Sequence, residues 1–280
     1  MTTAGRRVRT WLIRAAVGCW LLGAEAGMRA AEARVGPANG TLLIVGGGAM
    51  GELWPRFLAL AGGRDAPIVV IPTANDPVRE EDAVVATLRR LGVRHVTQLH
   101  TRDPKVADTP EFTAPLREAR AVWITGGRQW RLADAYLRTR TQREIVAVLE
   151  RGGVVGGSSA GATIQGSYLV RGAREGNRIM MSPGHEEGFA LVRDAAIDQH
   201  VNTRGRADDL RPVLRRHPRL LGIGLDEATA IIVRGDVCEV AGAGTARFFA
   251  GAEAAPALLQ AGGRYDLAAR APLPLTAAAQ

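Results

Sequence analysis

Short apolar runs alternate with amphipathic stretches between residues 41 and 160, and this alternation predicts a regular order of strands and helices. Five apolar runs have the length of buried strands and lie at residues 42–45, 68–71, 95–99, 121–124 and 153–156. Helical spacing of apolar residues occurs at residues 52–61, 79–91 and 129–149. Because the strands are almost continuously apolar, the sequence predicts an α/β fold with a mostly parallel sheet and helices on both faces.

The pattern changes beyond residue 222. Two apolar runs, residues 230–233 and 237–240, flank Arg234-Gly235-Asp236 and predict a hairpin. Residues 266–280 are rich in Ala, Pro and Leu and predict a flexible tail. With 280 residues and 46% hydrophobic content, the chain can bury one sizeable core. A single α/β domain is therefore expected over residues 40–265.

The first 33 residues have the order of parts found in a secretory signal peptide. Three arginines precede a mostly apolar stretch, residues 11–23, and small-x-small cleavage sequences follow at residues 24–26 and 31–33. Arg14 interrupts the apolar stretch, so an amphipathic or disordered extension is the alternative. The stretch is short for a membrane span. The sequence thus predicts a leader over residues 1–33, a periplasmic or secreted protein, and no stable membrane insertion once the leader is removed.

The formal net charge is +8, and the leader supplies part of it. The other arginines are scattered, so a basic, solvated surface is the simplest interpretation, and attraction of an acidic substrate or polymer is the alternative. Basic residues are not interleaved with aromatic ones, which argues against nucleic-acid binding. No His, Cys, Asp and Glu cluster has metal-ligand spacing, so neither a metal nor another cofactor is expected.

The motif that carries chemistry is Gly157-Ser158-Ser159-Ala160-Gly161, which fits G-x-S-x-G. It follows the fifth predicted strand and precedes a predicted helix over residues 160–167, which is the context of a nucleophile elbow. The register of the glycines favours Ser159 over the serine before it. A helix N-terminus behind Ser159 would favour developing negative charge. The amides of Ala160 and of Gly127, on the neighbouring strand, are the expected oxyanion donors.

A serine nucleophile needs a base, and the base needs an acid that orients it. The five candidates for the base are His95, His100, His185, His200 and His217. The preferred one is His200, because it lies where an apolar run gives way to a polar loop, and His185 is second. The acidic pair Asp226-Glu227 interrupts an apolar run, and buried carboxylates are costly without a partner. The alternative is that this pair marks a turn between two strands.

One further motif, Gly46-Gly47-Gly48-Ala49-Met50-Gly51, fits the G-x-G-x-x-G pattern of dinucleotide-binding folds. Such a site also needs a carboxylate at the end of the second strand, where this chain has Ile71-Pro72-Thr73. We therefore interpret these glycines as a tight turn between a strand and a helix.

Taken together, the motifs resemble those of cyanophycinases and related peptidases, a group that includes the aspartyl dipeptidase peptidase E. The resemblance covers about residues 40–245 and rests on residues 46–48, 124–129, 157–162, 198–200 and 226–230. It implies a fold similar to class I glutamine amidotransferases, which is flavodoxin-like, with a serine in place of their cysteine.

The resemblance implies a role for each member of a catalytic set: Ser159 as nucleophile, His200 as general base and Glu227 as the orienting acid. It also implies a substrate pocket lined by Gln129, Asp198, Gln199, Arg204 and Arg206. An arginine fork suits a substrate carboxylate. The family usually has Gly-Gly-Asp-Gln where this chain has Gly126-Gly127-Arg128-Gln129, so Arg128 inverts a charge at the rim of the site.

The expected activity is that of a serine exopeptidase or isopeptidase that cleaves aspartyl linkages, with the β-Asp-Arg links of cyanophycin as a candidate substrate. The partner is then a peptide or a cyanophycin-like polymer. One alternative is an aspartyl dipeptidase of other specificity, and another is a non-catalytic binding protein on the same scaffold. The oligomeric state is left open, with a homodimer as one option.

Overall fold

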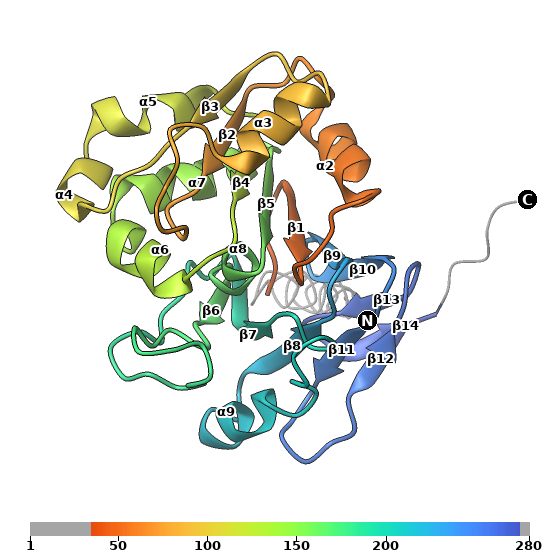
Figure 1. Cartoon of the computed structure of the whole chain (residues 1–280). Helices are drawn as coiled ribbons and strands as arrows, with labels where there is room; N and C mark the ends of the chain where they lie inside the picture. The colour runs from red at the N-terminus through yellow and green to blue at the C-terminus, as the bar shows by residue number, and fades with distance from the viewer. Residues whose placement is uncertain (1–34, 275–280) are drawn as a thin grey trace, which may run out of the picture. The chain divides into compact units, whose positions relative to one another are not determined.

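The computed structural model describes residues 35–274, in which strands and helices form two sheets with covering helices (Figure 1). The predicted leader lies outside these residues. The strands are β1 (Thr41–Val45), β2 (Ile68–Ile71), β3 (Val96–Gln98), β4 (Ala121–Ile124), β5 (Val154–Ser158), β6 (Gly166–Tyr168), β7 (Val192–Asp198), β8 (Leu221–Leu225), β9 (Thr229–Arg234), β10 (Val237–Gly242), β11 (Ala246–Phe249), β12 (Ala257–Leu259), β13 (Arg264–Asp266) and β14 (Ala271–Leu273). The helices are α2 (Leu53–Ala61), α3 (Ala83–Arg90), α4 (Pro104–Ala107), α5 (Pro110–Glu118), α6 (Gln129–Tyr136), α7 (Arg140–Glu150), α8 (Ala160–Thr163) and α9 (Leu210–Arg216).

The larger sheet has nine strands in the order β14-β13-β10-β9-β1-β5-β4-β2-β3. Its five predicted strands, β1 to β5, are confirmed and are all parallel. The predicted hairpin is also present as β9 and β10 and joins the edge of β1 in antiparallel pairing. Four of the eight adjacent pairs are antiparallel, so the expectation of a mostly parallel sheet holds only for the first half of the chain.

A second sheet, in the order β12-β11-β8-β7-β6, was not predicted from the sequence. Its strands β6, β7 and β8 run parallel to one another. The helix expected over residues 160–167 is wrong in its second half, because α8 ends at Thr163 and β6 starts at Gly166. The reason is pairing across the chain: residues 166–168 gain β7 as a neighbour, with Gly166 opposite Val192.

Helices cover both faces of the larger sheet, as predicted (Figure 1). On one face α2 and α3 contribute Phe57 and Leu88, which belong to the same buried cluster as the strand residue Leu43. On the other face α5 and α7 contribute Leu116 and Ile145, which belong to the same buried cluster as Leu42 and Ile44. The two faces of β1 therefore feed two separate apolar cores.

The ordered sheet continues beyond residue 265, where the sequence predicted a flexible tail. Strand β13 pairs with β14, placing Arg264 opposite Leu273 and Asp266 opposite Ala271. Backbone hydrogen bonding, which composition does not report, holds this segment. The domain therefore extends through Leu273.

Within residues 35–274, no helix combines the length and the hydropathy needed to cross a bilayer.

An aromatic cluster joins α2 to the centre of the sheet. The ring of Trp123 on β4 lies 4.6 Å from that of Trp54 and 4.9 Å from that of Phe57, measured between centroids. Gly156 on the neighbouring strand β5 makes room for it: a Cβ at this position would lie 2.6 Å from the Trp123 ring and 3.0 Å from that of Phe57. The glycine is required by the packing of Trp123 rather than by its backbone conformation.

We predict that Gly156→Ala lowers the free energy of unfolding by about 1–3 kcal/mol, because overpacking a dense core forces side chains from their rotamers. The matched control is Gly251→Ala, where an added Cβ would meet no atom within 4 Å and the stability should change by less than about 1 kcal/mol. Urea unfolding of both variants measures the difference. Equal stabilities would contradict the packing argument.

Candidate active site

The turn that follows β5 holds Ser159 in an uncommon backbone conformation. Its φ is 57° and its ψ is −112°, and positive φ is rare for residues other than glycine. Small neighbours permit the turn, since a Cβ at Gly161 would overlap the carbonyl of Ile124. The amide of Ser159 donates to the Val45 carbonyl at 3.0 Å, which ties the turn to the end of β1. This is the strained strand-to-helix geometry that a nucleophile elbow requires.

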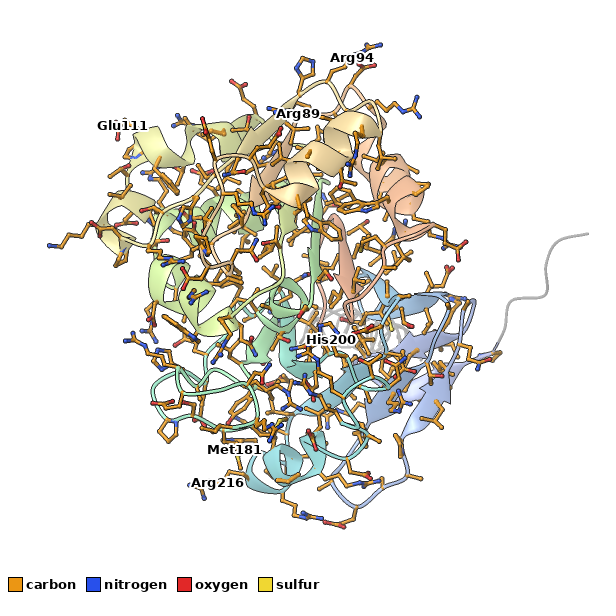
Figure 2. The ribbon with its side chains drawn as sticks, viewed as in Figure 1. Arg89, Arg94, Glu111, Met181, His200 and Arg216 are labelled. Carbon is orange, nitrogen blue, oxygen red and sulfur yellow. The ribbon has the colours of Figure 1, made fainter. Side chains whose placement is uncertain are left out.

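Ser159, His200 and Glu227 lie in one hydrogen-bonded chain. His200 Nε2 is 2.9 Å from Ser159 Oγ, and His200 Nδ1 is 2.5 Å from Glu227 Oε1. Thr203 Oγ1 donates to the same Glu227 oxygen at 3.0 Å. Figure 2 shows His200 in the middle of the molecule, and its side chain is largely buried. The three groups are connected in the order in which a hydroxyl can lose its proton to an oriented imidazole.

The site lies where the two sheets meet. Ser159 follows β5 of the larger sheet, whereas His200 and Glu227 follow the neighbouring parallel strands β7 and β8 of the smaller one. The end of β1 connects them: the amide of His200 donates to the Gly46 carbonyl at 2.8 Å, and that of Ala228 donates to the Gly47 carbonyl at 2.8 Å. Together with the bond from Ser159, three successive carbonyls of this strand end hold the three segments of the site.

The glycine run after β1 has a role that the sequence did not reveal. A Cβ at Gly47 would overlap the His200 ring, and one at Gly48 would lie 2.8 Å from the Cβ of Glu227. Both glycines have positive φ, 110° and 72°. The prediction of a tight turn is therefore incomplete, because the run also admits the imidazole and the carboxylate. One signal in the sequence could have indicated this role: the glycine run follows β1, the strand next to β5, which leads into the turn at Ser159.

Burial sets the protonation states of the pair. Desolvation is the main cause that lowers the pKa of His200, with help from the nearby cations Arg204 and Arg206, while Glu227 opposes the shift. The hydrogen bond from His200, followed by that from Thr203, lowers the pKa of Glu227. Near neutral pH, Glu227 is thus ionised and His200 is neutral, which leaves Nε2 able to accept a proton.

The turn at Gly126 and Gly127 borders the serine. A Cβ on Gly126 would lie 3.3 Å from the Cβ of Ser159 and 3.8 Å from its Oγ. Gly127 has a φ of 133°, and Ala160 opens α8 directly after the serine. Both predicted oxyanion donors, Gly127 and Ala160, therefore belong to turns that adjoin Ser159. Their role stays a prediction.

Four of the five predicted substrate-binding residues lie in the interior. The exposed fractions are 1% for Gln129, 0% for Asp198, 3% for Gln199 and 6% for Arg206. Gln129 Nε2 donates to the Val170 carbonyl at 3.0 Å, and Arg206 Nη1 donates to the carbonyl of Gln199 at 2.9 Å. Of the five, only Arg204 is exposed. The structure thus brings Asp198, Gln199 and Arg206 together beside His200, as a buried polar cluster.

This cluster contains an arginine that sequence reasoning missed. Arg171 is 2% exposed and donates to Asp198 through two parallel bonds, Nε to Oδ1 at 2.8 Å and Nη2 to Oδ2 at 2.7 Å. It also donates to Asp209 at 2.6 Å. A signal was present in the sequence, because Arg171 directly follows the apolar run Tyr168-Leu169-Val170.

Two other expectations concerned residues near the rim. His185, the second candidate for the base, lies outside the Ser159 chain and contacts Asp134, with Nε2 2.8 Å from Oδ1. Arg128, expected to invert a charge at the rim, donates instead to the backbone carbonyls of Ala173 and Arg174, at 2.7 and 3.2 Å. Its guanidinium therefore anchors the segment that follows Arg171.

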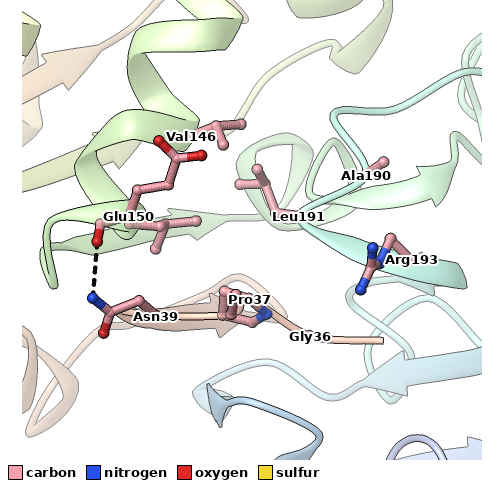
Figure 3. A pocket seen from close by; sticks show the side chains of 10 residues that line it. Gly36, Pro37, Asn39, Val146, Glu150, Ala190, Leu191 and Arg193 are labelled. Carbon is pink, nitrogen blue, oxygen red and sulfur yellow. Dashed lines mark hydrogen bonds between the residues drawn. The ribbon is translucent and has the colours of Figure 1, made fainter. Parts of the chain in front are cut away.

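A cavity of about 340 Å³ lies elsewhere on the domain (Figure 3). Its lining comes from the first described residues, the end of α7 and the start of β7: Gly36, Pro37, Ala38, Asn39, Val146, Leu149, Glu150, Ala190, Leu191 and Arg193. None of the predicted site residues lines it.

Across residues 35–274, no three His, Cys, Asp or Glu side chains are grouped so as to hold a metal ion.

Comparison with known proteins gives a consistent family. A cyanophycinase of Geminocystis herdmanii is 32% identical over 200 residues, which cover 69% of this chain and 73% of the relative. A cyanophycinase of Trichormus variabilis is 30% identical over 216 residues, covering 73% of this chain and 72% of the relative.

Two solved structures share the fold. A peptidase from an acI-B1 actinobacterium superposes with a TM-score of 0.63 at 24% identity, covering 81% of this chain and 97% of that one. A putative peptidase E protein from Listeria monocytogenes has a TM-score of 0.53 at 21% identity, covering 74% of this chain and all of that one. The profile of Peptidase family S51 matches residues 42–241, and the chain accordingly belongs to this family of peptidases.

Proposed function

We propose that this chain is a serine peptidase that hydrolyses aspartyl peptide or isopeptide bonds, with Ser159 as nucleophile. The observation that carries the proposal is the hydrogen-bonded chain from Ser159 Oγ through His200 to Glu227. A hydroxyl on a strained turn, connected through an imidazole to a carboxylate, is the arrangement that serine hydrolases use for acyl transfer.

In the proposed mechanism, Ser159 Oγ attacks the scissile carbonyl while His200 Nε2 takes its proton. The ionised Glu227 stabilises the imidazolium that forms. The amides of Ala160 and Gly127 stabilise the oxyanion of the tetrahedral intermediate. His200 then donates the proton to the leaving amine, and an ester between Ser159 and the substrate remains. Water, deprotonated by His200, hydrolyses this ester and regenerates the serine.

Two features support an acidic substrate. Two cations lie close to the base, because the charges of Arg204 and Arg206 both contribute to lowering the pKa of His200. Two similar proteins are named cyanophycinases, and the family resemblance implies the β-Asp-Arg links of cyanophycin as a substrate. We include such links in the proposed substrate class. The predicted leader extends the proposal to a periplasmic or secreted enzyme.

The nucleophile can be tested by Ser159→Ala, which should lower kcat by about a thousandfold or more, because it removes the hydroxyl that is hydrogen-bonded to His200 Nε2. The matched control is Ser158→Ala, which should keep kcat within a few fold. A serine-directed phosphonate should label the wild type and Ser158→Ala, and mass spectrometry of peptic peptides should place the adduct on Ser159. A wild type that neither reacts with the phosphonate nor cleaves any peptide would favour a binding protein, because a pure binder has no activated serine. Cleavage by Ser159→Ala would reject the mechanism.

Substrate class is tested with a panel of β-Asp-Arg dipeptide, soluble cyanophycin, α-Asp-X dipeptides and the matching Asn peptides. We expect cleavage of the aspartyl members and at least about tenfold lower kcat/KM for the Asn members, because a charged hydrogen bond to the carboxylate is lost. Measurement is by release of free amine. Activity on α-Asp-X alone would indicate a dipeptidase, and equal rates on Asn peptides would exclude aspartyl specificity.

The pH dependence follows from the lowered pKa of His200. The neutral imidazole is the base, so kcat/KM should rise with pH and reach its plateau with a midpoint below about 6.5. Arg204 disfavours the imidazolium, so Arg204→Gln should raise this pKa and move the acidic limb to higher pH. The activity of the variant therefore begins to fall at a higher pH than that of the wild type.

The readout is the midpoint of the kcat/KM profile, which is independent of a uniform loss of substrate binding. The control is Arg94→Gln, whose arginine lies far from His200 in Figure 2 and pairs with the exposed Asp65. Its midpoint should match that of the wild type. A midpoint that moves to lower pH in Arg204→Gln would contradict the assigned electrostatics.

A further inference from the structure

Two buried arginines, Arg171 and Arg206, lie near Asp198, but only Arg171 is hydrogen-bonded to it. Arg171 binds Asp198 through two bonds of 2.8 and 2.7 Å and binds Asp209 at 2.6 Å. Arg206 Nη1 is 3.6 Å from Asp198 Oδ1, which is beyond hydrogen-bonding distance. Among residues 35–274, the guanidinium of Arg206 donates hydrogen bonds to the carbonyl of Gln199 at 2.9 Å and to its Oε1 at 3.1 Å.

Arg206 is thereby a buried cation with incomplete compensation. Its exposed fraction is 6%, and burial lowers its pKa to about 10, although Asp198 opposes that shift. Neutral oxygens stabilise a guanidinium less than a carboxylate does at hydrogen-bonding distance. A cation in this state favours an incoming anion.

The position of this cation suits a substrate group next to the scissile bond. Gln199, which holds the guanidinium, directly precedes His200, and the charge of Arg206 contributes to lowering the pKa of the base. An anion drawn to Arg206 would therefore be close to the point where Ser159 attacks. The competing anion within the protein is Asp198, which is fully buried and already held by Arg171.

We propose that Arg171 is a positioning residue for substrate selection: by holding Asp198 and Asp209, it leaves Arg206 available to bind a carboxylate of the substrate. The inference rests on the proposed function, in which that carboxylate belongs to the aspartyl residue at the cleaved bond. Arg171 acts through the other charged groups and does not contact substrate. In a variant that lacks Arg171, Asp198 forms an ion pair with Arg206, and Arg206 can then no longer bind the substrate carboxylate.

The test measures L-aspartate and L-asparagine binding by calorimetry, together with kcat and KM for β-Asp-Arg dipeptide. Arg171→Met should weaken L-aspartate binding and raise KM by about tenfold or more, since a charge-assisted bond is lost, with a smaller change in kcat. Asp198→Asn, which keeps Arg171 on Asp209, is the reference for the double variant, because it reports what the loss of the Asp198 charge alone does to aspartate binding. Arg171→Met combined with Asp198→Asn should restore aspartate binding, because the internal competitor is gone.

A structural role alone would give a different pattern. The control Arg151→Met removes an arginine that donates to the carbonyls of Leu116 and Ala119, before the start of β5 and away from Ser159, and should change neither constant. If Arg171→Met does not fold, Arg171→Lys replaces it, because one ammonium cannot reproduce the two parallel bonds to Asp198. Arg171→Lys should then weaken aspartate binding several fold.

Unchanged aspartate affinity in the folded Arg171 variants overturns the inference, and so does a double variant that fails to regain it. Loss of aspartate binding in Asp198→Asn also overturns it, because Asp198 would then be needed itself. If the wild type cleaves no aspartyl peptide, the proposed function fails, whereas the aspartate-binding series still decides the role of Arg171.

Discussion

Three successive carbonyls at the end of β1 support the whole site. Those of Val45, Gly46 and Gly47 accept hydrogen bonds from the amides of Ser159, His200 and Ala228, which belong to segments far apart in the chain. The three acceptors lie one residue apart on one strand end, so they fix the spacing of the segments that carry Ser159, His200 and Glu227. Each donor residue has a positive φ, 57°, 54° and 53°, which costs about 1–3 kcal/mol each. These hydrogen bonds are among the interactions that hold the three conformations.

Burial and neighbouring charges together set the protonation states of His200 and Glu227. Burial keeps the imidazole of His200 neutral, so it can accept a proton, while its hydrogen bond keeps Glu227 ionised. Cations next to the base push in the same direction as burial. In the proposed function, the same cations attract an acidic substrate, so one set of charges would serve both proton transfer and substrate selection.

The sequence predicted the parts of this protein that local patterns determine. Five apolar runs gave β1 to β5, and the glycines around Ser159 gave the elbow, because each needs only near neighbours along the chain. The second sheet was not predicted, since β6 is three residues long and β7 contains Arg193 and Asp194, so neither has a clear apolar pattern. Pairing between distant segments, rather than composition, makes these residues strands.

The same distinction explains which site residues could be found. His200 and Glu227 were assigned by their polar settings and by family resemblance, and no local pattern could have measured their distance from Ser159. Gly47 looked like part of a turn because the His200 ring that excludes its side chain is contributed by a residue far along the chain. Arg171 looked like an ordinary charge at the end of an apolar run, yet its carboxylate partners come from β7 and from the loop before α9. In the proposed role, Arg171 holds Asp198 and so keeps this carboxylate away from Arg206. Such a role leaves no sequence motif, and only the arrangement of charges in space identifies it.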